Sequence, residues 1–129
     1  MEGRTAIIFL DYQDRRPIYE QIVERFQQLI VRGALEPGSQ MPSVRQMAAE
    51  LSINPNTIQK AYGVLEQEGY IFPVKGRGSF VAEAAAVREK RRQLSMDKLD
   101  ACLREVRELG FGRQECVKEV DKIYGEGQR

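Results

Sequence analysis

The side chains best suited to chemistry in this 129-residue chain lie in one stretch, NPNTIQKAYG, which begins at residue 54. At helical spacing, Asn56, Lys60 and Gly63 share one outward face, with Thr57 and Gln59 at its flanks. Asn and Gln amides can pair with adenine through two hydrogen bonds, and a Lys ammonium can reach guanine or a phosphate. These residue types predict contact with nucleic-acid bases. A plain solvated helix face has a similar composition, so the surrounding elements must separate the two interpretations.

Two short helices with separate caps are predicted to hold these side chains. Ser43 and Gln46 match the S-x-x-Q capping box, and Asn54 is a second N-cap with Pro55 at the first helical position. Gly69 ends the second helix. The inward apolar stripes are Val44, Met47, Ala48 and Leu51 in the first helix and Ile58, Ala61, Tyr62 and Leu65 in the second. Because only two residues separate the helices, the sequence predicts a helix-turn-helix, and this context favours nucleic-acid contact.

Elements on either side complete a small domain. The apolar residues 5–12 predict a short strand or a docking arm. A helix with one apolar face is predicted from Pro17 to Gly33, followed by a turn at residues 37–38. Residues 70–83 predict a strand, a glycine-containing turn and a second strand. The predicted fold is therefore mainly α with a small β-hairpin, a winged helix-turn-helix domain over residues 1–82.

Three cations are placed where a phosphate could meet them. Arg45 lies at the start of the first motif helix, beside unpaired N–H groups that favour an anion; the alternative is a surface arginine paired with an acid. Lys75 and Arg77 flank Gly76 in the sequence KGRGS at the hairpin tip. That sequence lacks the full pattern of a nucleotide-binding loop and precedes a strand, so nucleotide binding is rejected. The tip is predicted to touch the DNA backbone or to enter the minor groove.

Residues 83–129 predict two amphipathic helices broken at residues 110–112. Such helices need a partner face, which a second subunit would supply. Cys102 and Cys116 lie among apolar residues, which favours buried thiols over a disulfide or a redox or metal switch. The run REKRR at residues 88–92 fits a solvated helix face, with an auxiliary DNA contact as the alternative. The predicted dimerisation residues are Leu99, Leu103, Val106, Leu109, Val117, Val120, Ile123 and Tyr124.

Composition narrows the classes of function. The absence of histidine excludes a Cys/His zinc site and removes the commonest general base, so no metal, cofactor or enzyme active site is predicted. No apolar run approaches the ~20 residues of a membrane span, and the N-terminus lacks the plan of a signal peptide, so a cytoplasmic protein is expected. The net charge is only +1, from 20 basic and 19 acidic residues. An anionic partner must therefore be met by a local patch.

Three segments resemble the GntR family of bacterial transcription regulators, namely LEPGSQMPSVRQMAAEL (35–51), NPNTIQKAYGVLEQEGYI (54–71) and GRGSFV (76–81). With PIYEQI at residues 17–22, the short C-terminal part is similar to the YtrA subfamily, whose tail is a two-helix dimerisation segment. Pro55 departs from the basic residue that many members hold there, and Lys60 is the candidate to replace that contact. The resemblance implies DNA contacts from Arg45, Asn54, Asn56, Thr57, Gln59, Lys75 and Gly76, to which we add Ser43, Lys60 and Arg77.

The function expected from these observations is that of a dimeric winged helix-turn-helix repressor. Two recognition helices about 34 Å apart would require an inverted-repeat operator, and the subfamily suggests transporter genes as targets. The alternative is a winged-helix module that binds protein; a near-neutral charge favours it, but the polar face lacks the aromatic anchors of a protein interface. The effector is open: a small molecule could bind at the dimer interface, or regulation could rest on protein level alone.

Overall fold

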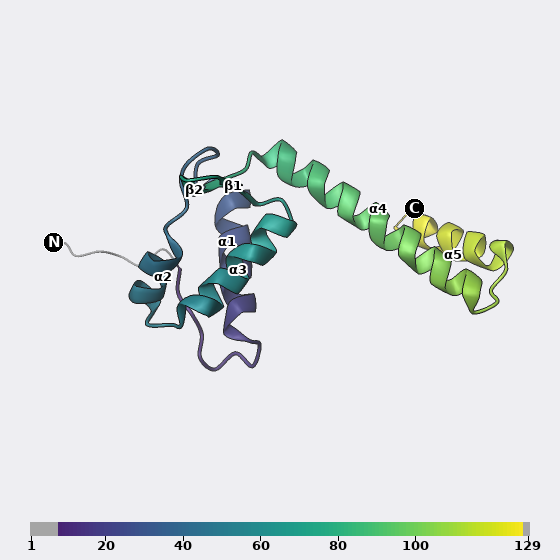
Figure 1. The fold of residues 1–129 in the computed structure, drawn as a ribbon. Helices are drawn as coiled ribbons and strands as arrows, with labels where there is room; N and C mark the ends of the chain where they lie inside the picture. The colour runs from purple at the N-terminus through teal and green to yellow at the C-terminus, as the bar shows by residue number, and fades with distance from the viewer. Residues whose placement is uncertain (1–7, 128–129) are drawn as a thin grey trace. The chain divides into compact units, whose positions relative to one another are not determined.

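The computed structural model describes residues 8–127 as five helices and a two-stranded sheet (Figure 1). The helices are α1 (Ile18–Val31), α2 (Val44–Leu51), α3 (Pro55–Gln67), α4 (Ala84–Glu108) and α5 (Arg113–Gly125), and the strands are β1 (Ile71–Val74) and β2 (Gly78–Val81). The predicted fold class is confirmed. The chain divides into two compact units, with the boundary between Arg91 and Arg92 within α4.

The first unit is built on the packing of α1 and α2 against α3. Phe26 of α1 meets Tyr62 of α3 edge to face, with ring centroids 5.8 Å apart, and both are buried. The Tyr62 hydroxyl donates a hydrogen bond to the Pro42 carbonyl at 2.7 Å. Burial, followed by the charge of Glu50, raises the pKa of Tyr62, so its hydroxyl remains a donor at neutral pH. One side chain therefore fills the core and ties α3 to the residues that precede α2.

The two motif helices begin where their caps predict. The Ser43 hydroxyl accepts the N–H of Gln46 at 3.0 Å, and the Asn54 side-chain oxygen accepts the N–H of Asn56 at 2.8 Å. Of the predicted reciprocal capping box, only the Ser43 half is present. Each cap satisfies one of the orphan N–H groups of a helix start, which sets the first residue of that helix.

The turn between α2 and α3 relies on a left-handed residue. Ser52 has φ 56°, a conformation that few residues other than glycine adopt. The N–H of Ile53 then returns to the Ala48 carbonyl at 3.0 Å, and the N–H of Ser52 to the Ala49 carbonyl at 3.4 Å. This Schellman-type ending closes α2 within one residue and sets the direction in which α3 begins.

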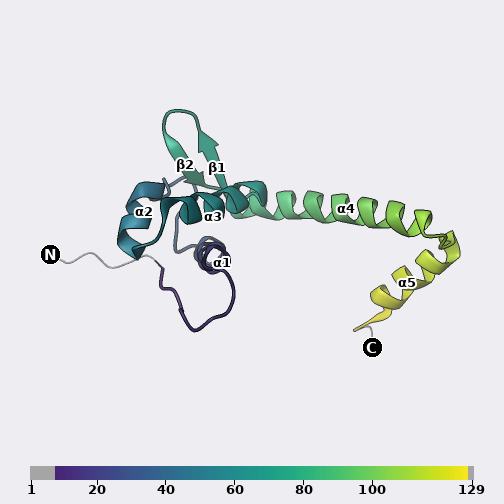
Figure 2. The same cartoon turned by 60° about the horizontal axis from the view of Figure 1, so that its bottom comes forward.

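The hairpin of β1 and β2 is antiparallel (Figure 2). Phe72 lies opposite Phe80, and their rings are stacked with centroids 6.1 Å apart. The segment before α2, predicted only as a turn, also pairs with β2. Its Met41 N–H donates to the Ser79 carbonyl at 2.8 Å, and the Val81 N–H donates to the Ser39 carbonyl at 2.9 Å. The hairpin is therefore attached by backbone hydrogen bonds to the start of the helix-turn-helix.

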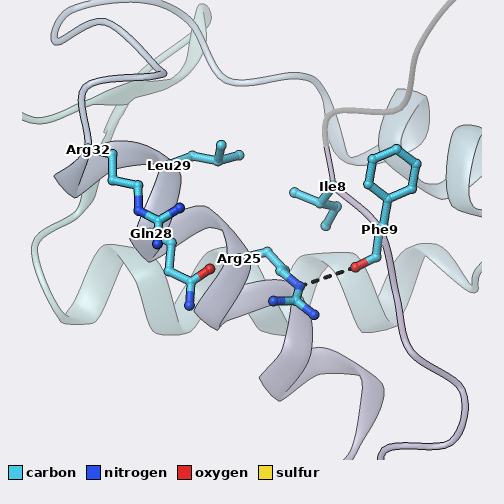
Figure 3. Close-up of a pocket in the computed structure, with 6 residues that line it drawn as sticks. All are labelled: Ile8, Phe9, Arg25, Gln28, Leu29 and Arg32. Atoms are coloured by element: carbon cyan, nitrogen blue, oxygen red, sulfur yellow. Dashed lines mark hydrogen bonds between the residues drawn. The ribbon is translucent and has the colours of Figure 1, made fainter.

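The N-terminal arm lies along α1 without forming a strand in its described part. Ile8 is 2% exposed, and Arg25 donates through Nε to the Phe9 carbonyl at 3.2 Å (Figure 3). The buried Gln21 side chain accepts a hydrogen bond from the Asp11 N–H at 2.9 Å and donates one to the Asp11 carbonyl at 3.1 Å. The backbone of the arm is thus bonded by a side-chain amide and not by a neighbouring strand. Of the two predictions for this segment, a strand or a docking arm, residues 8–12 form the docking arm. Residues 5–7 of that prediction lie outside the described residues.

The second unit contains the end of α4, a tight connection and α5. Gly110 has φ 93°, and the N–H of Phe111 returns to the Val106 carbonyl at 3.1 Å. The Gly112 N–H then donates to the Glu115 carboxylate at 2.8 Å as α5 begins. The predicted break at residues 110–112 is confirmed. None of the helices between residues 8 and 127 combines the length and apolar character needed to cross a bilayer.

The prediction of buried thiols is wrong for the chain taken alone. Cys102 is exposed and Cys116 is half-buried. Two helices cannot enclose their own apolar stripes, so residues at core-like spacing remain in contact with water.

A matched pair of glycine substitutions tests the attachment of α4 to the first unit. Gly69 has φ 85°, and a Cβ there would lie 2.5 Å from Lys90 Cγ; Gly33 has φ 79°, with nothing within 4 Å. We expect Gly69→Ala to lower the free energy of unfolding by about 3 kcal/mol, and Gly33→Ala by about 1 kcal/mol, because only the first adds a clash to the backbone strain. Urea denaturation of both variants measures the difference. Equal losses would contradict the close approach of α4 to the end of α3.

Candidate nucleic-acid interface

The outward face of α3 carries most of the predicted base-contact residues. Asn56, Gln59 and Lys60 are exposed and Thr57 is half-buried, whereas the inward stripe of this helix is buried. A Cβ built at Gly63 would meet nothing within 4 Å. The polar side chains are therefore turned away from the core, and the helix surface at Gly63 is open to close approach.

The outward face lies between two edges that pack against different elements. On one edge, the Ser79 hydroxyl of β2 donates to the Glu66 carboxylate at 3.5 Å, and Gln59 lies two turns earlier on that same edge. On the other edge, Gln27 of α1 donates to Glu68 at 2.7 Å. Gln59 is thus on the hairpin side of α3, and the opposite edge faces α1.

Lys60 leans towards the α1 edge. Its Nζ lies 4.0 Å from the centroid of the Tyr19 ring, a cation–π contact. Tyr19 lies in the helix predicted between Pro17 and Gly33, for which the sequence predicts only an apolar face. Neither residue type nor spacing along one helix signals this contact, because it joins two different helices.

Arg45 and Asn54 lie at the starts of α2 and α3. Arg45 is exposed at the second position of α2, and no acidic side chain between residues 8 and 127 pairs with it. The alternative of a surface ion pair therefore finds no partner in the described chain. Asn54 is exposed, but its side-chain oxygen is engaged as a helix cap. Only the amide NH₂ of Asn54 is left to donate to an external acceptor.

The hairpin tip presents exposed Lys75, Gly76 and Arg77. Gly76 has φ 77°, within the predicted glycine-containing turn, and the Arg77 N–H donates to the Val74 carbonyl at 2.9 Å. The Gln40 side chain, which sequence reasoning missed, donates to the Arg77 carbonyl at 2.6 Å. The backbone of the tip is thereby held in place, while within the described chain the two cationic side chains make no ion pair.

The predicted dimerisation residues keep large exposed surfaces in the second unit. Six of them are exposed by 43% or more, namely Leu99, Leu103, Leu109, Val120, Ile123 and Tyr124, and Val106 and Val117 are half-buried. The prediction omitted Met96 and Phe111, which are also exposed. Met96 lies three residues before Leu99, so helical spacing could have identified it. Large exposed apolar side chains at helical spacing make this unit a candidate interaction site.

A capped two-helix motif with an outward polar helix, followed by a cationic hairpin, defines the winged helix-turn-helix class of DNA-binding domains. Residues 18–81 match the family model described as bacterial regulatory proteins, gntR family. The chain belongs to this family, as a transcriptional regulator with a DNA-binding domain and not an enzyme.

Two relatives from Bacillus subtilis extend the match beyond residues 18–81. The chain is 37% identical over 117 residues to the HTH-type transcriptional regulator YhcF, covering 90% of this chain and 96% of that protein. It is 38% identical over 101 residues to the HTH-type transcriptional repressor YtrA, covering 70% of this chain and 78% of that protein. The resemblance to the YtrA subfamily is confirmed.

One similar solved structure is that of a protein domain bound to DNA. The AraR DNA-binding domain in complex with operator ORE1 has a TM-score of 0.51 and 30% identity. It covers 57% of this chain, and 89% of that domain is matched.

Proposed function

We propose that this regulator is a transcriptional repressor that binds an inverted-repeat operator as a homodimer. The observation that carries the proposal is the outward polar face of α3. Before it in the chain lies the exposed Arg45, which pairs with no acidic side chain of residues 8–127, and after it comes a cationic hairpin tip. Two comparisons support it, because the relative YtrA is named a repressor and the AraR domain was solved on an operator.

The candidate DNA-contact residues fall into groups according to whether they are assigned to base edges or to phosphates. Asn56 and Gln59 occupy the outward face of α3 and are assigned to base edges, where their amides can read adenine. Arg45 and the tip residues Lys75 and Arg77 are assigned to phosphates, which set orientation and affinity. Four further residues, Ser43, Asn54, Thr57 and Gly76, support the contact as caps or neighbours. A few cations that contact phosphates give a steep salt dependence even at a net charge of +1.

Residues 1–82 are assigned to DNA binding and residues 83–129 to dimerisation. The exposed apolar side chains of α4 and α5 support this division, because a second copy would remove them from water. A two-fold dimer would place its recognition helices about one DNA turn, ~34 Å, apart. By analogy with the subfamily, the proposal extends to a cytoplasmic protein that binds operators of transporter genes. Its regulation would come from a small-molecule effector bound at the dimer interface, or from the amount of the protein alone.

Selection of bound sequences from a random duplex pool tests the proposal. The full-length wild-type chain is expected to enrich an inverted repeat with half-site centres about 10 base pairs apart. Gln59→Ala should enrich the same repeat but lose preference at one base pair of each half-site, because a bidentate contact is worth about 1–3 kcal/mol of discrimination. Enrichment of no sequence, or of a single asymmetric site, would overturn the proposed operator.

A further inference from the structure

Lys60 is the one candidate DNA contact on α3 whose side chain is engaged by another helix. Its Nζ lies 4.0 Å from the centroid of the Tyr19 ring on α1. Val64, one turn further along α3, lines the same hollow of about 360 Å³ as Tyr19. The ammonium is thus held at the α1 edge of the helix, whereas Asn56 and Gly63 lie along its outward face.

We propose that Lys60 binds a backbone phosphate at the rim of the major groove, and that Tyr19 is the positioning residue that holds it there. This inference rests on the proposed function and refines it. Lys60 could chemically reach either guanine or phosphate, and its position above Tyr19 directs it away from the bases that face Asn56 and Gln59.

The chemistry of a cation–π contact suits this role. A lysine ammonium has three N–H donors. Those that point away from the ring remain free to donate to a phosphate oxygen. The ring also restricts a flexible four-carbon side chain that would otherwise lose rotamer freedom on binding. Carboxylates of Glu20, Glu24 and Glu68 line the same hollow. Glu24 is paired with Arg16 and Glu68 accepts a hydrogen bond from Gln27, and no ion pair joins Lys60 to an acidic side chain among the described residues. Contact with the ring therefore leaves the charge of the ammonium available to a phosphate.

A double-mutant cycle on the full-length chain tests the proposal. Wild type, Lys60→Met, Tyr19→Leu, Tyr19→Phe and the Tyr19→Leu/Lys60→Met double variant are titrated with the selected operator and with random duplex of equal length. Fluorescence anisotropy at several salt concentrations gives the affinity and its salt slope.

Lys60→Met is expected to weaken binding to both duplexes equally, by about fivefold per half-site at 0.15 M salt, and to reduce the salt slope by about 0.9 per half-site. Tyr19→Leu should weaken binding to both by about two- to fivefold per half-site. Tyr19→Phe keeps the ring and should bind within twofold of wild type. Because Tyr19 acts through Lys60, the double variant should bind no more weakly than Lys60→Met.

Three outcomes would overturn the proposal. A Lys60→Met loss confined to the operator would mean that Lys60 reads a base. An additive loss in the double variant would mean that Tyr19 acts through the stability of α1 or through its own contact. Normal binding by Tyr19→Leu would remove the positioning role while leaving the proposed repressor intact. Failure of the wild type to bind either duplex would instead remove the proposed function, and this inference with it.

Discussion

Replacing Leu103 with glutamate is expected to convert the regulator to a monomer and to lower its affinity for a two-half-site operator by about 10²–10⁴-fold. Leu103 is 43% exposed on the apolar stripe of α4. In the proposed dimer this carboxylate would be buried and unpaired at the interface, at a cost of several kcal/mol. That cost is enough to dissociate a dimer held together by the apolar stripes of α4 and α5. Each monomer would then bind a half-site without the effective concentration that its partner provides.

Gln114→Glu is the matched control for this experiment. It introduces the same negative charge at an exposed position of α5, outside the apolar stripe, and removes no hydrophobic group. Sedimentation equilibrium measures the oligomeric state, and anisotropy on full and half operators measures binding. The two variants should differ on the full operator and agree on the half operator. A dimeric Leu103→Glu protein with normal operator affinity would exclude this face as the dimer interface.

Arg45→Ala is expected to weaken binding to every duplex sequence by tenfold or more per half-site. A charge-assisted hydrogen bond is worth about 1.5–3 kcal/mol, and Arg45 is exposed at the start of α2 with no acidic partner in the described chain. The salt slope should fall by about 0.9 per half-site, since one phosphate contact is lost. Gel-shift titrations against operator and random duplex measure both effects.

Arg113→Ala controls for the loss of one guanidinium from the total charge, because Arg113 is exposed at the start of α5 in the other unit. Arg45→Lys adds a second comparison. It keeps the charge but loses the bidentate fork, so it should recover only part of the affinity. If Arg45→Ala binds random duplex as the wild type does, the phosphate contact assigned to Arg45 is wrong.

The sequence alone determined the features that depend on neighbours within one helical turn. The caps at Ser43 and Asn54 each bond an N–H two or three residues later, and Gly69 and Gly110 have the positive φ angles of helix ends. The apolar stripe of α3 also follows from 3.6-residue periodicity, and its four residues are all buried. Such features could be predicted because their partners lie close along the chain.

Only the tertiary structure decided which distant residues meet. Gln40 bonds the hairpin tip across 37 residues, and Gln21 bonds the N–H and the carbonyl of Asp11 in the N-terminal arm. Tyr19 of α1 lies 4.0 Å from Lys60 Nζ at one edge of α3. The tertiary structure also shows that Cys102 is exposed, although this residue has the helical spacing of a core residue. The physical reason is that local bonds decide where a helix begins and which face is apolar. The side chain that lies opposite depends on how whole helices pack, and periodicity along one helix carries no information about its neighbour.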